Sequence, residues 1–435
     1  MRRDLASAYF ASVGRILSWV VVSALVYRTI GASAFAMLAL VRGTIGLLNY
    51  VSLGLAPALI HHAAGADADS SRAANSLRTL YSNALSLAYA TGFIGIFISG
   101  IYAAYFPSIY SVPHGLQGHI WQLTLLIGIG TILRFVSDAP GAVLQLKERI
   151  ALDNTILAAG DLGWMAGVGV LLWLTPATTN GLTDIGLLYA FSGACVFAMR
   201  LSFAATHTGI ALPMSGEASR EIQGILLRYG ALIVAAQLAD YLYSPTDYIL
   251  IARLLSTSDI ANYAPAVQID SGLLLVVSGL AAVLLPKAAL AYSTGSTQTL
   301  RRYYFRGTFA SAALLLIAAF AVWIISPWLF RIWFGNSMPG TRAILPLVLV
   351  NTVIGGSGAV GRSILLAVGK ARAFAVSVLV TGIANVICSY CFVHYLHWGL
   401  NGIVLGTVVA VVGRCLIWMP WYIHHCFFAL SPLKT

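Results

Sequence analysis

Charged residues are scarce in this sequence: they make up 9% of the 435 residues, whereas hydrophobic residues make up 59%. A soluble protein carries about a quarter charged residues, so this composition excludes an ordinary soluble domain. The apolar residues form continuous runs of about 20 instead of alternating with polar ones, which excludes a transmembrane β-barrel. The sequence therefore predicts an all-α polytopic membrane protein.

Catalytic and metal-binding patterns are also absent. The five cysteines lie in apolar segments, and the CxxC pair of Cys388 and Cys391 has no second pair or acidic loop beside it, so we interpret them as packing residues. Residues 355–361 (GGSGAVG) lack the Lys-Ser/Thr ending of a phosphate loop, which favours close helix packing. Since no Ser/His/Asp or Cys/His set shares one membrane depth, we expect no enzyme, no metal site and no organic cofactor.

The chain has no loop long enough to fold as a separate domain. A membrane-embedded glycosyltransferase or O-antigen ligase would need such a domain for its sugar donor, so this class is disfavoured. A net charge of +11 would indicate nucleic acid in a soluble protein. Here the basic residues belong mostly to short loops beside apolar runs, so we expect them to set topology and expect no nucleic-acid partner.

Twelve apolar runs predict about twelve transmembrane helices joined by short loops. They cover approximately residues 6–29, 34–60, 77–106, 117–146, 149–174, 184–207, 222–254, 259–291, 304–330, 341–368, 371–396 and 398–428. The first run follows a basic start, as in a secretory signal peptide. However, Arg15 interrupts that run and it is long enough to span, so we expect a retained first helix.

The distribution of basic residues predicts the orientation of these helices. Of the 25 Lys and Arg residues, fifteen fall on the side that holds both termini, four fall on the opposite side and six fall within predicted spans. Because loops rich in Lys and Arg remain in the cytoplasm, we expect both termini there.

An internal repeat relates the two halves of the chain. A shift of 225 positions lays residues 28–64 over 253–289 without a gap, with identities such as Arg28/Arg253, Ser33/Ser258 and Gly54/Gly279. An even number of spans separates the copies, so the repeat is parallel. We predict two six-helix lobes, residues 1–210 and 211–435, related by a pseudo-twofold axis around a central cavity.

Ionisable residues at membrane depth indicate function, because each costs about 2.5–3.5 kcal/mol there. Arg200 and Arg362 lie within about two turns of the cytoplasmic boundary, so we interpret them as snorkelling residues. The remaining deep charges are Arg15, Arg42, Arg134, Asp138, Asp161, Asp240, Asp247, Asp270 and Arg414. Arg134 and Asp138 are four residues apart, so they either neutralise each other or serve the function.

The predicted seventh span, residues 222–254, carries two aspartates and a proline. Asp240 and Asp247 are seven residues apart and project from the same side of a helix. Pro245 removes a backbone hydrogen bond between them and predicts a hinge. The 225-residue shift places Arg15 over Asp240, so a cation and an anion would face each other across the cavity.

Several segments resemble the polysaccharide-export flippases of the MOP superfamily, the Wzx-type translocases of O-antigen and lipid-linked oligosaccharide. The resemblance covers nearly the whole chain at dispersed positions. It is carried by residues 52–59 (SLGLAPAL), 247–289 with Asn262-Tyr263 and Pro286, 365–374 (LLAVGKARAF), Asn385 and 399–407 (GLNGIVLGT).

This resemblance implies a two-lobed carrier in the bacterial inner membrane that moves a polyprenyl-diphosphate-linked glycan to the periplasmic leaflet by alternating access. A polysaccharide polymerase or glycosyltransferases would be its partners, and a closed carrier of this kind works as a monomer in contact with membrane lipids. The cavity arginines Arg15, Arg42, Arg134 and Arg414 suit a diphosphate headgroup, which arginine binds through paired hydrogen bonds.

The aspartates are expected to have a different role. Asp240 or Asp247 would couple transport to H⁺ or Na⁺, as acidic residues do in the drug-extruding MATE branch, while Asp138, Asp161 and Asp270 are further cavity charges. Tyr241, Tyr243 and Tyr248 would stack on sugar rings or simply pack. The alternative function is a MATE-like, cation-coupled exporter of small organic molecules; its cavity should be net acidic, whereas four arginines and five aspartates are near balance.

Overall fold

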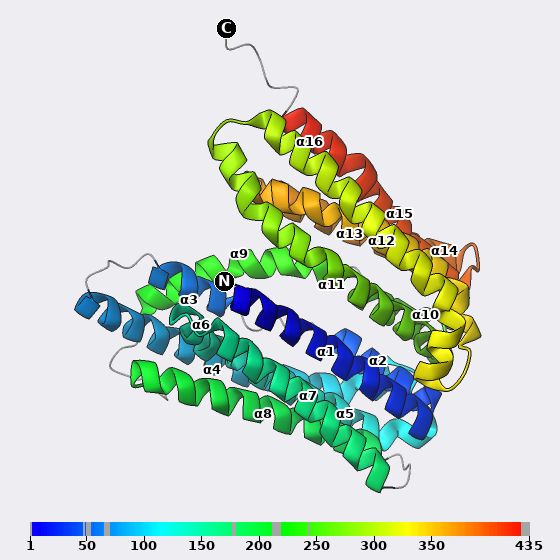
Figure 1. Cartoon of the computed structure of the whole chain (residues 1–435). Coiled ribbons are helices and arrows are strands. Elements are labelled where there is room, and N and C mark those ends of the chain that lie inside the picture. Colours follow the sequence, from blue (N-terminus) through cyan, green and yellow to red (C-terminus); the bar gives the residue numbers. More distant parts are fainter. Residues whose placement is uncertain are drawn as a thin grey trace. The chain divides into compact units, whose positions relative to one another are not determined.

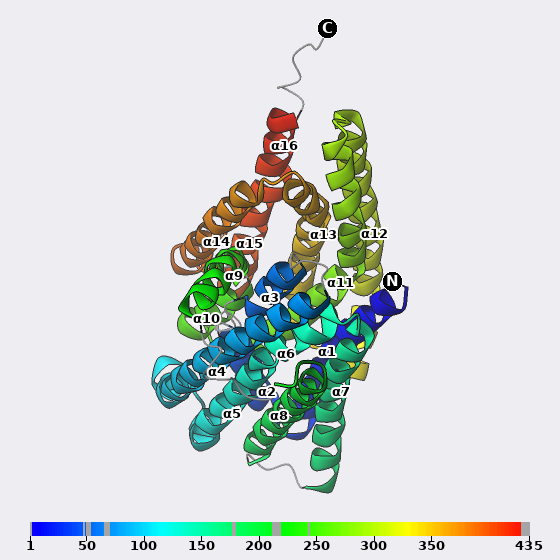
Figure 2. The same cartoon turned by 90° about the vertical axis from the view of Figure 1, so that its left-hand side faces the viewer.

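The computed structural model describes residues 2–46, 48, 54–64, 70–175, 180–210, 219–241 and 244–427. All regular secondary structure in these segments is helical (Figures 1 and 2). Contacts divide the chain into two compact units, Met1–Leu238 (unit 1) and Ala239–Thr435 (unit 2). Each unit is therefore described by itself.

Unit 1 contains the first nine α-helices. They are α1 (Arg2–Thr29), α2 (Ala32–Ile45), α3 (Leu55–Ala64), α4 (Ser70–Ile109), α5 (Gln117–Val136), α6 (Asp138–Leu146), α7 (Ile150–Leu174), α8 (Gly181–Thr208) and α9 (Arg220–Tyr241), which ends just past the contact boundary. The sequence placed the lobe boundary at 210/211, before α9, whereas the contacts place it between Leu238 and Ala239.

Unit 2 contains the remaining helices. They are α10 (Ser244–Leu254), α11 (Thr257–Ser293), α12 (Thr297–Phe334), α13 (Pro339–Ala367), α14 (Ala371–His394), α15 (Gly399–Val412), the π-helix η4 (Gly413–Trp418) and α16 (Met419–Phe427). The capping box of Ser256 and Asp259 fixes the start of α11, because each side chain bonds the other's backbone N–H.

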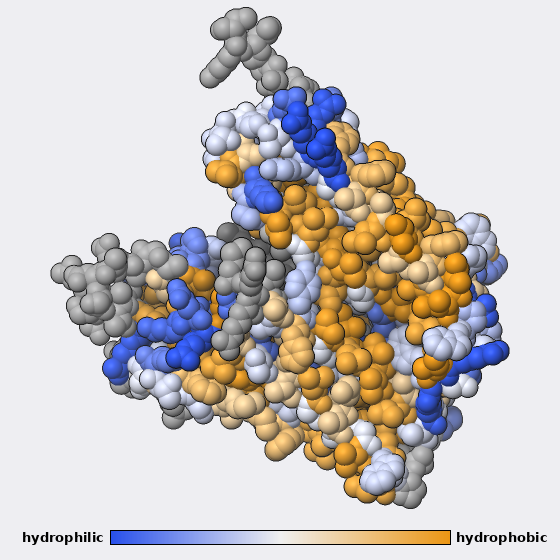
Figure 3. Space-filling view, in the orientation of Figure 1, coloured by the Kyte–Doolittle hydropathy of each residue, from blue (hydrophilic) through white to orange (hydrophobic). Residues whose placement is uncertain are grey.

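The helices confirm the predicted fold class. Ten helical segments in the described part of the chain are long and apolar enough to cross a membrane. The predicted second and seventh spans each correspond to two shorter helices, α2 with α3 and α9 with α10. Figure 3 shows hydrophobic residues over most of the helix flanks on the visible face, as a lipid environment requires.

The same helix pairs pack in both units, as the predicted internal repeat requires. The recurring pairs are α1–α7, α3–α6, α4–α5, α5–α8 and α7–α8 in unit 1, and α10–α14, α11–α13, α12–α13, α13–α15 and α14–α15 in unit 2. Each unit 1 pair corresponds, in the order given, to the unit 2 pair formed by the predicted spans numbered six higher. One pattern of helix packing therefore occurs twice in the chain.

Glycines allow the closest of these contacts. A Cβ built on Gly193 of α8 would lie 2.6 Å from the carbonyl oxygen of Gly130 on α5, and one on Gly406 of α15 would lie 2.6 Å from the backbone nitrogen of Ser389 on α14. The predicted packing role of the 355–361 glycines is confirmed, since a Cβ on Gly358 would lie 2.7 Å from Cys415 Sγ.

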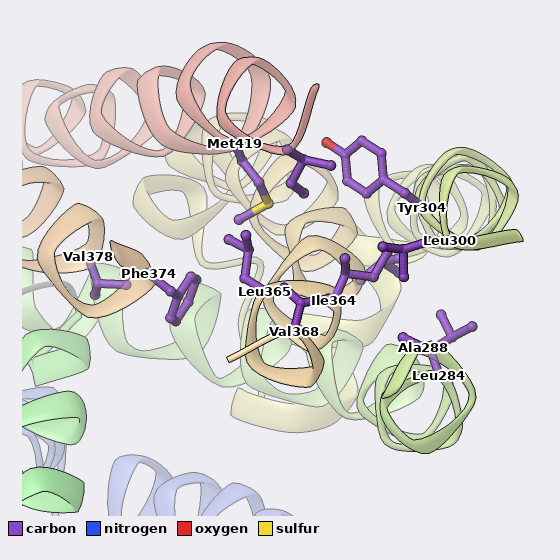
Figure 4. Packing of buried hydrophobic residues seen from close by; sticks show 12 residues of the cluster. Leu284, Ala288, Leu300, Tyr304, Ile364, Leu365, Val368, Phe374, Val378 and Met419 are labelled. Carbon is purple, nitrogen blue, oxygen red and sulfur yellow. The ribbon is translucent and has the colours of Figure 1, made fainter. Parts of the chain in front are cut away.

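An apolar cluster holds together the ends of α11, α12, α13, α14 and α16 in unit 2 (Figure 4). Leu365 of α13 and Val368, which follows its last residue, lie between Phe374 of α14 and Leu300 of α12, and Met419 of α16 points toward them. This packing fixes the beginning of α14 against η4 and α16.

Candidate functional sites in the two units

Unit 1 encloses a cavity of about 360 Å³ among α1, α2, α5, α6, α7 and α8. Arg15, Arg42 and Arg134, which the sequence predicted to share a site, all line this cavity. Asp138 and Asp161 line it as well. With all five groups ionised, the lining carries one more positive than negative charge.

Asp161 is the anionic centre of this cavity. Its side chain is 3% exposed and pairs with the guanidinium of Arg134, which is 11% exposed. Arg134 Nη2 also donates to Ser192 Oγ at 2.9 Å, and that hydroxyl donates to the Gly160 carbonyl at 2.7 Å. Arg15 reaches Asp161 at 3.5 Å with its side chain 55% exposed, so much of its guanidinium remains accessible to a ligand.

Aromatic rings form one wall of the same cavity. Trp19 and Tyr189 line it, with ring centroids 5.7 Å apart, and Trp164 packs behind both. The Arg42 guanidinium lies 4.2 Å from the Trp19 ring centroid and that of Arg134 lies 5.0 Å from the Tyr189 centroid. These cation–π contacts hold two of the arginines in place.

The possible pairing of Arg134 with Asp138 is wrong. The two residues would be neighbours on a continuous helix, but α5 ends at Val136 and α6 begins at Asp138. Pro140 contributes to this break, since it lacks the N–H that would bond the Val136 carbonyl. Arg134 therefore pairs with Asp161, and Asp138 pairs with a different arginine.

That arginine is Arg200, and its interpretation as a snorkelling residue is also wrong. Arg200 is 2% exposed. Its Nε donates to Asp153 Oδ1 at 2.8 Å, and its Nη1 donates to Asp138 Oδ1 at 3.1 Å. The buried Asp153 of α7 and the partly exposed Asp138 of α6 thus draw the guanidinium inward, where the pairing offsets its desolvation.

Unit 2 contains a cavity of about 250 Å³ among α10, α11, α13, α15 and η4. Asp247, Asp270 and Arg414 are its ionisable groups together with Tyr263, so carboxylates outnumber arginines. Apart from α14, the counterpart of α7, it is built from the helices that correspond to those around the unit 1 cavity. The two halves of the repeat therefore carry cavities of opposite net charge.

Asp247 lies in the first turn of α10 and is fully buried. Tyr263 Oη and Thr407 Oγ1 donate to its Oδ2 at 2.8 and 2.9 Å, and Asn385 Nδ2 donates to its Oδ1 at 3.1 Å. Among the described residues no Lys, Arg or His pairs with this carboxylate. Its charge is held by neutral donors alone, which is the arrangement of a group that takes up a proton or a cation.

The surroundings of Asp247 contain more acceptor oxygens than hydroxyl protons. Thr407 has one hydroxyl proton but lies within 3.0 Å of both Asp247 Oδ2 and Asn385 Oδ1. Ser389 Oγ likewise lies 3.2 Å from Asn385 Oδ1 and 3.1 Å from the Ile403 carbonyl. Such a carboxylate, amide, hydroxyl and carbonyl set suits a hard cation.

Asp270 and Arg414 occupy the rest of the unit 2 cavity. Asp270 accepts a hydrogen bond from Thr352 Oγ1 at 2.5 Å, and Asn351 Oδ1 is a buried acceptor without a donor among the described residues. Arg414 thus lies in a cavity of unit 2, whereas the other three predicted headgroup residues share the cavity of unit 1.

Three predictions concern the seventh span. Asp240 lies in α9, but its side chain, like those of Tyr241 and Tyr243, falls outside what the structure describes. Pro245 is the second residue of α10, where its missing N–H interrupts no helical hydrogen bond, so its hinge role stays a prediction. Tyr248 is buried and packs edge-on against Tyr263, with centroids 5.2 Å apart.

Sequence patterns assigned no functional role to the neutral residues around Asp247. Asn385 and Tyr263 entered only as points of resemblance, and Thr407 only as the end of a resembling segment. A signal was present, because a carboxylate at membrane depth without a basic partner must find polar side chains on neighbouring spans.

Comparison with known proteins agrees with the fold. Residues 233–391 match the MatE family model. The structure is similar to an inward-facing multidrug resistance MATE family transporter of the MOP superfamily, with a TM-score of 0.75 and 16% identity over 99% of both chains. It is also similar to the lipid II flippase MurJ in an inward closed conformation, with a TM-score of 0.71 and 10% identity over 98% of this chain and 87% of that one.

A MATE transporter from Vibrio cholerae shares the fold as well, with a TM-score of 0.65 and 13% identity over 100% of this chain and 97% of that chain. No curated protein matches the sequence. At these identities the likeness shows a common fold.

Proposed function

We propose that this protein is an ion-coupled transporter that flips a polyprenyl-diphosphate-linked oligosaccharide from the cytoplasmic to the periplasmic leaflet for surface polysaccharide synthesis. The observation that carries the proposal is the unit 1 cavity with its three arginines. Guanidinium groups form paired, charge-assisted hydrogen bonds with phosphate oxygens. The aromatic wall of Trp19 and Tyr189 offers a face on which a sugar ring stacks.

The accessible guanidinium of Arg15 is the first contact for the diphosphate, and Arg42 is the second. Arg134 is already engaged by Asp161, so it fixes the depth of the site and contributes positive potential. The cavity volume lies within the usual range for ligand sites of about 300–1,000 Å³. It accommodates the headgroup, while the polyprenyl chain remains in lipid.

Asp247 supplies the ion coupling in this proposal, and the ion is Na⁺. The carboxylate oxygens would hold it together with the Tyr263 and Thr407 hydroxyls and the Asn385 amide oxygen. These oxygen donors suit a hard cation, and the single carboxylate among them matches the charge of a monovalent one. The excess of acceptors around Thr407 is relieved when a cation binds at the carboxylate, and we propose Na⁺ because the hydroxyl and amide oxygens can coordinate it together with the carboxylate.

The coupling follows from the cost of a buried charge. Without an ion, the Asp247 carboxylate is held only by neutral donors, whereas bound Na⁺ neutralises it. A state that keeps the Asp247 site formed is therefore stabilised by Na⁺, and an ion gradient biases the conformational cycle. Both termini lie in the cytoplasm and the chain works as a monomer in the inner membrane.

The test uses the purified full chain in proteoliposomes with a fluorescent polyprenyl-diphosphate oligosaccharide. We expect flipping that an outward-to-inward Na⁺ gradient accelerates, and an Arg15→Gln/Arg42→Gln variant that loses about tenfold or more in apparent affinity for the diphosphate lipid. Arg342→Gln, which changes an exposed arginine outside both cavities, is the matched control. Equal flipping by the double variant and the control overturns the headgroup assignment.

A second candidate function is export of small organic cations. Asp138 and Asp161 line the unit 1 cavity beside its aromatic rings, and such rings also attract cations. Uptake of a fluorescent organic cation into the same proteoliposomes distinguishes the two functions. Cation transport without diphosphate-lipid flipping would replace our proposal with this one.

A further inference from the structure

A groove of about 740 Å³ lies on unit 2 between α14 and the helix that runs through α15, η4 and α16. Its middle is apolar and outward-facing: Val376 and Val380 of α14 are 52% and 60% exposed, and Val409 of α15 is 47% exposed. This groove is separate from the residues that bind Asp247.

Basic side chains collect at one end of the groove. Lys370 and Arg372 stand at the start of α14 and are exposed, and Arg414 reaches the groove from η4. Trp418 and Tyr422 lie at the same end with their rings stacked 5.0 Å apart. None of the residues that line the groove is Asp or Glu.

The cluster in Figure 4 anchors this basic end. Phe374 of α14 belongs to that cluster, and the guanidinium groups of Arg362 and Arg414 lie 5.6 and 5.9 Å from its ring centroid. Trp418 and Tyr422 pack against the same cluster. The cationic end is thus built on a packed core.

The length of the groove matches one leaflet of a bilayer. It extends along α14 from Lys370 to Ala384, which at ~1.5 Å per residue is about 20 Å. Half of a hydrocarbon core of about 30 Å, with the headgroup layer added, has a similar length. The basic end includes Lys370 and Arg372, which the Lys and Arg distribution predicts to lie on the cytoplasmic side.

We propose that this groove binds an anionic phospholipid of the cytoplasmic leaflet. Lys370, Arg372 and Arg414 receive the phosphate, Trp418 and Tyr422 lie at the headgroup level, and one acyl chain follows Val376, Val380 and Val409. The charges argue for a lipid with a net negative headgroup, because a zwitterionic headgroup would add a cation to an already basic site. The bound lipid is distinct from the transported cargo.

The π-helix gives this site its link to the interior. Arg414 is the second residue of η4 and lines both the groove and the cavity that contains Asp247 and Asp270. A π-helix is rare, occurs mostly as a single turn inside an α-helix and is frequent at functional sites. A lipid phosphate in the groove would therefore contact a guanidinium that also lines the cavity of Asp247 and Asp270.

Native mass spectrometry of the purified full chain with added phosphatidylglycerol or phosphatidylcholine tests the site. We expect a tightly held phosphatidylglycerol, and about tenfold to thirtyfold weaker retention in Lys370→Ala/Arg372→Ala, since each surface cation contributes a factor of about three to five. Arg302→Ala/Arg306→Ala removes two exposed arginines of α12 outside the groove and should retain the lipid.

Val380→Trp tests the acyl part independently, because it fills the groove at an exposed position without touching the basic end. We expect it to lower phosphatidylglycerol retention as well. Unchanged retention in both groove variants, equal loss in the α12 control, or equal retention of phosphatidylcholine would each overturn the proposal. Since the readout is lipid retention, the result does not depend on whether the protein flips a diphosphate lipid.

Discussion

Removal of Arg134 separates its structural role from its role in binding. In an Arg134→Met variant, Asp161 stays 3% exposed and keeps only Arg15, 3.5 Å away and 55% exposed, as a cationic partner. Loss of one partner from a buried pair costs about 3–5 kcal/mol, and an exposed pair returns at most about 1 kcal/mol. We therefore expect a destabilisation of about 2–4 kcal/mol.

The double variant Arg134→Met/Asp161→Asn removes both charges and should recover most of that loss, to within about 1 kcal/mol of the wild type. Ser192 still donates to the Gly160 carbonyl, so the α7–α8 contact persists. Transport should not recover, because the cavity has lost one of its arginines. Stability and flipping are thus expected to respond differently to the second substitution.

Thermal unfolding of the detergent-solubilised protein reports the first quantity, and flipping in proteoliposomes reports the second. Arg342→Met serves as the control for removal of an arginine outside the cavity. A single variant as stable as the wild type would refute the buried-pair reasoning. A double variant that flips at the wild-type rate would refute the role of Arg134 in the cavity.

Three other substitutions examine a glycine contact, the cation site and the second buried pair. Gly406→Val places side-chain atoms against the Ser389 backbone, so α14 and α15 must separate. Because Asn385 of α14 and Thr407 of α15 both contact Asp247, we expect that Na⁺ no longer raises the unfolding temperature of this variant. A retained Na⁺ effect contradicts this. Thr407→Val removes a donor to Asp247, and we expect half-saturation by Na⁺ to rise about tenfold while Thr407→Ser stays close to wild type. Arg200→Met leaves the buried Asp153 with the Gln145 amide but without a cationic partner, at a cost of about 3–5 kcal/mol, and addition of Asp153→Asn should restore the unfolding temperature if the pair is the cause.

Most of the fold could be predicted from the sequence because membrane insertion makes hydropathy a direct signal. An apolar run of about 20 residues has few alternatives to a helix in lipid. The repeat was visible because Gly54 and Gly279 sit in gapless matching segments. What hydropathy could not show is that single runs contain breaks, as between α5 and α6, since a one-residue interruption barely changes the average.

Hydropathy also could not show which residues the deep charges pair with. Arg134 pairs with Asp161 and Arg200 pairs with Asp153, and both acids lie on α7, far from their arginines in sequence. In the sequence, the short separation favoured Asp138 as the partner of Arg134. The closeness of Arg200 to the cytoplasmic boundary favoured a snorkelling side chain. Only the packing of α5, α7 and α8 decides these pairs.

The opposite charges of the two cavities bear on how the proposed transport cycle would respond to membrane voltage. An elementary charge that crosses the membrane exchanges about 2.3 kcal/mol with a potential of 100 mV. With all groups ionised, the three arginines and two aspartates of one cavity sum to one positive charge, and the two aspartates and one arginine of the other sum to one negative charge. Because these charges sum to zero, we expect the potential to act on the proposed cycle mainly through the bound ion and the anionic cargo.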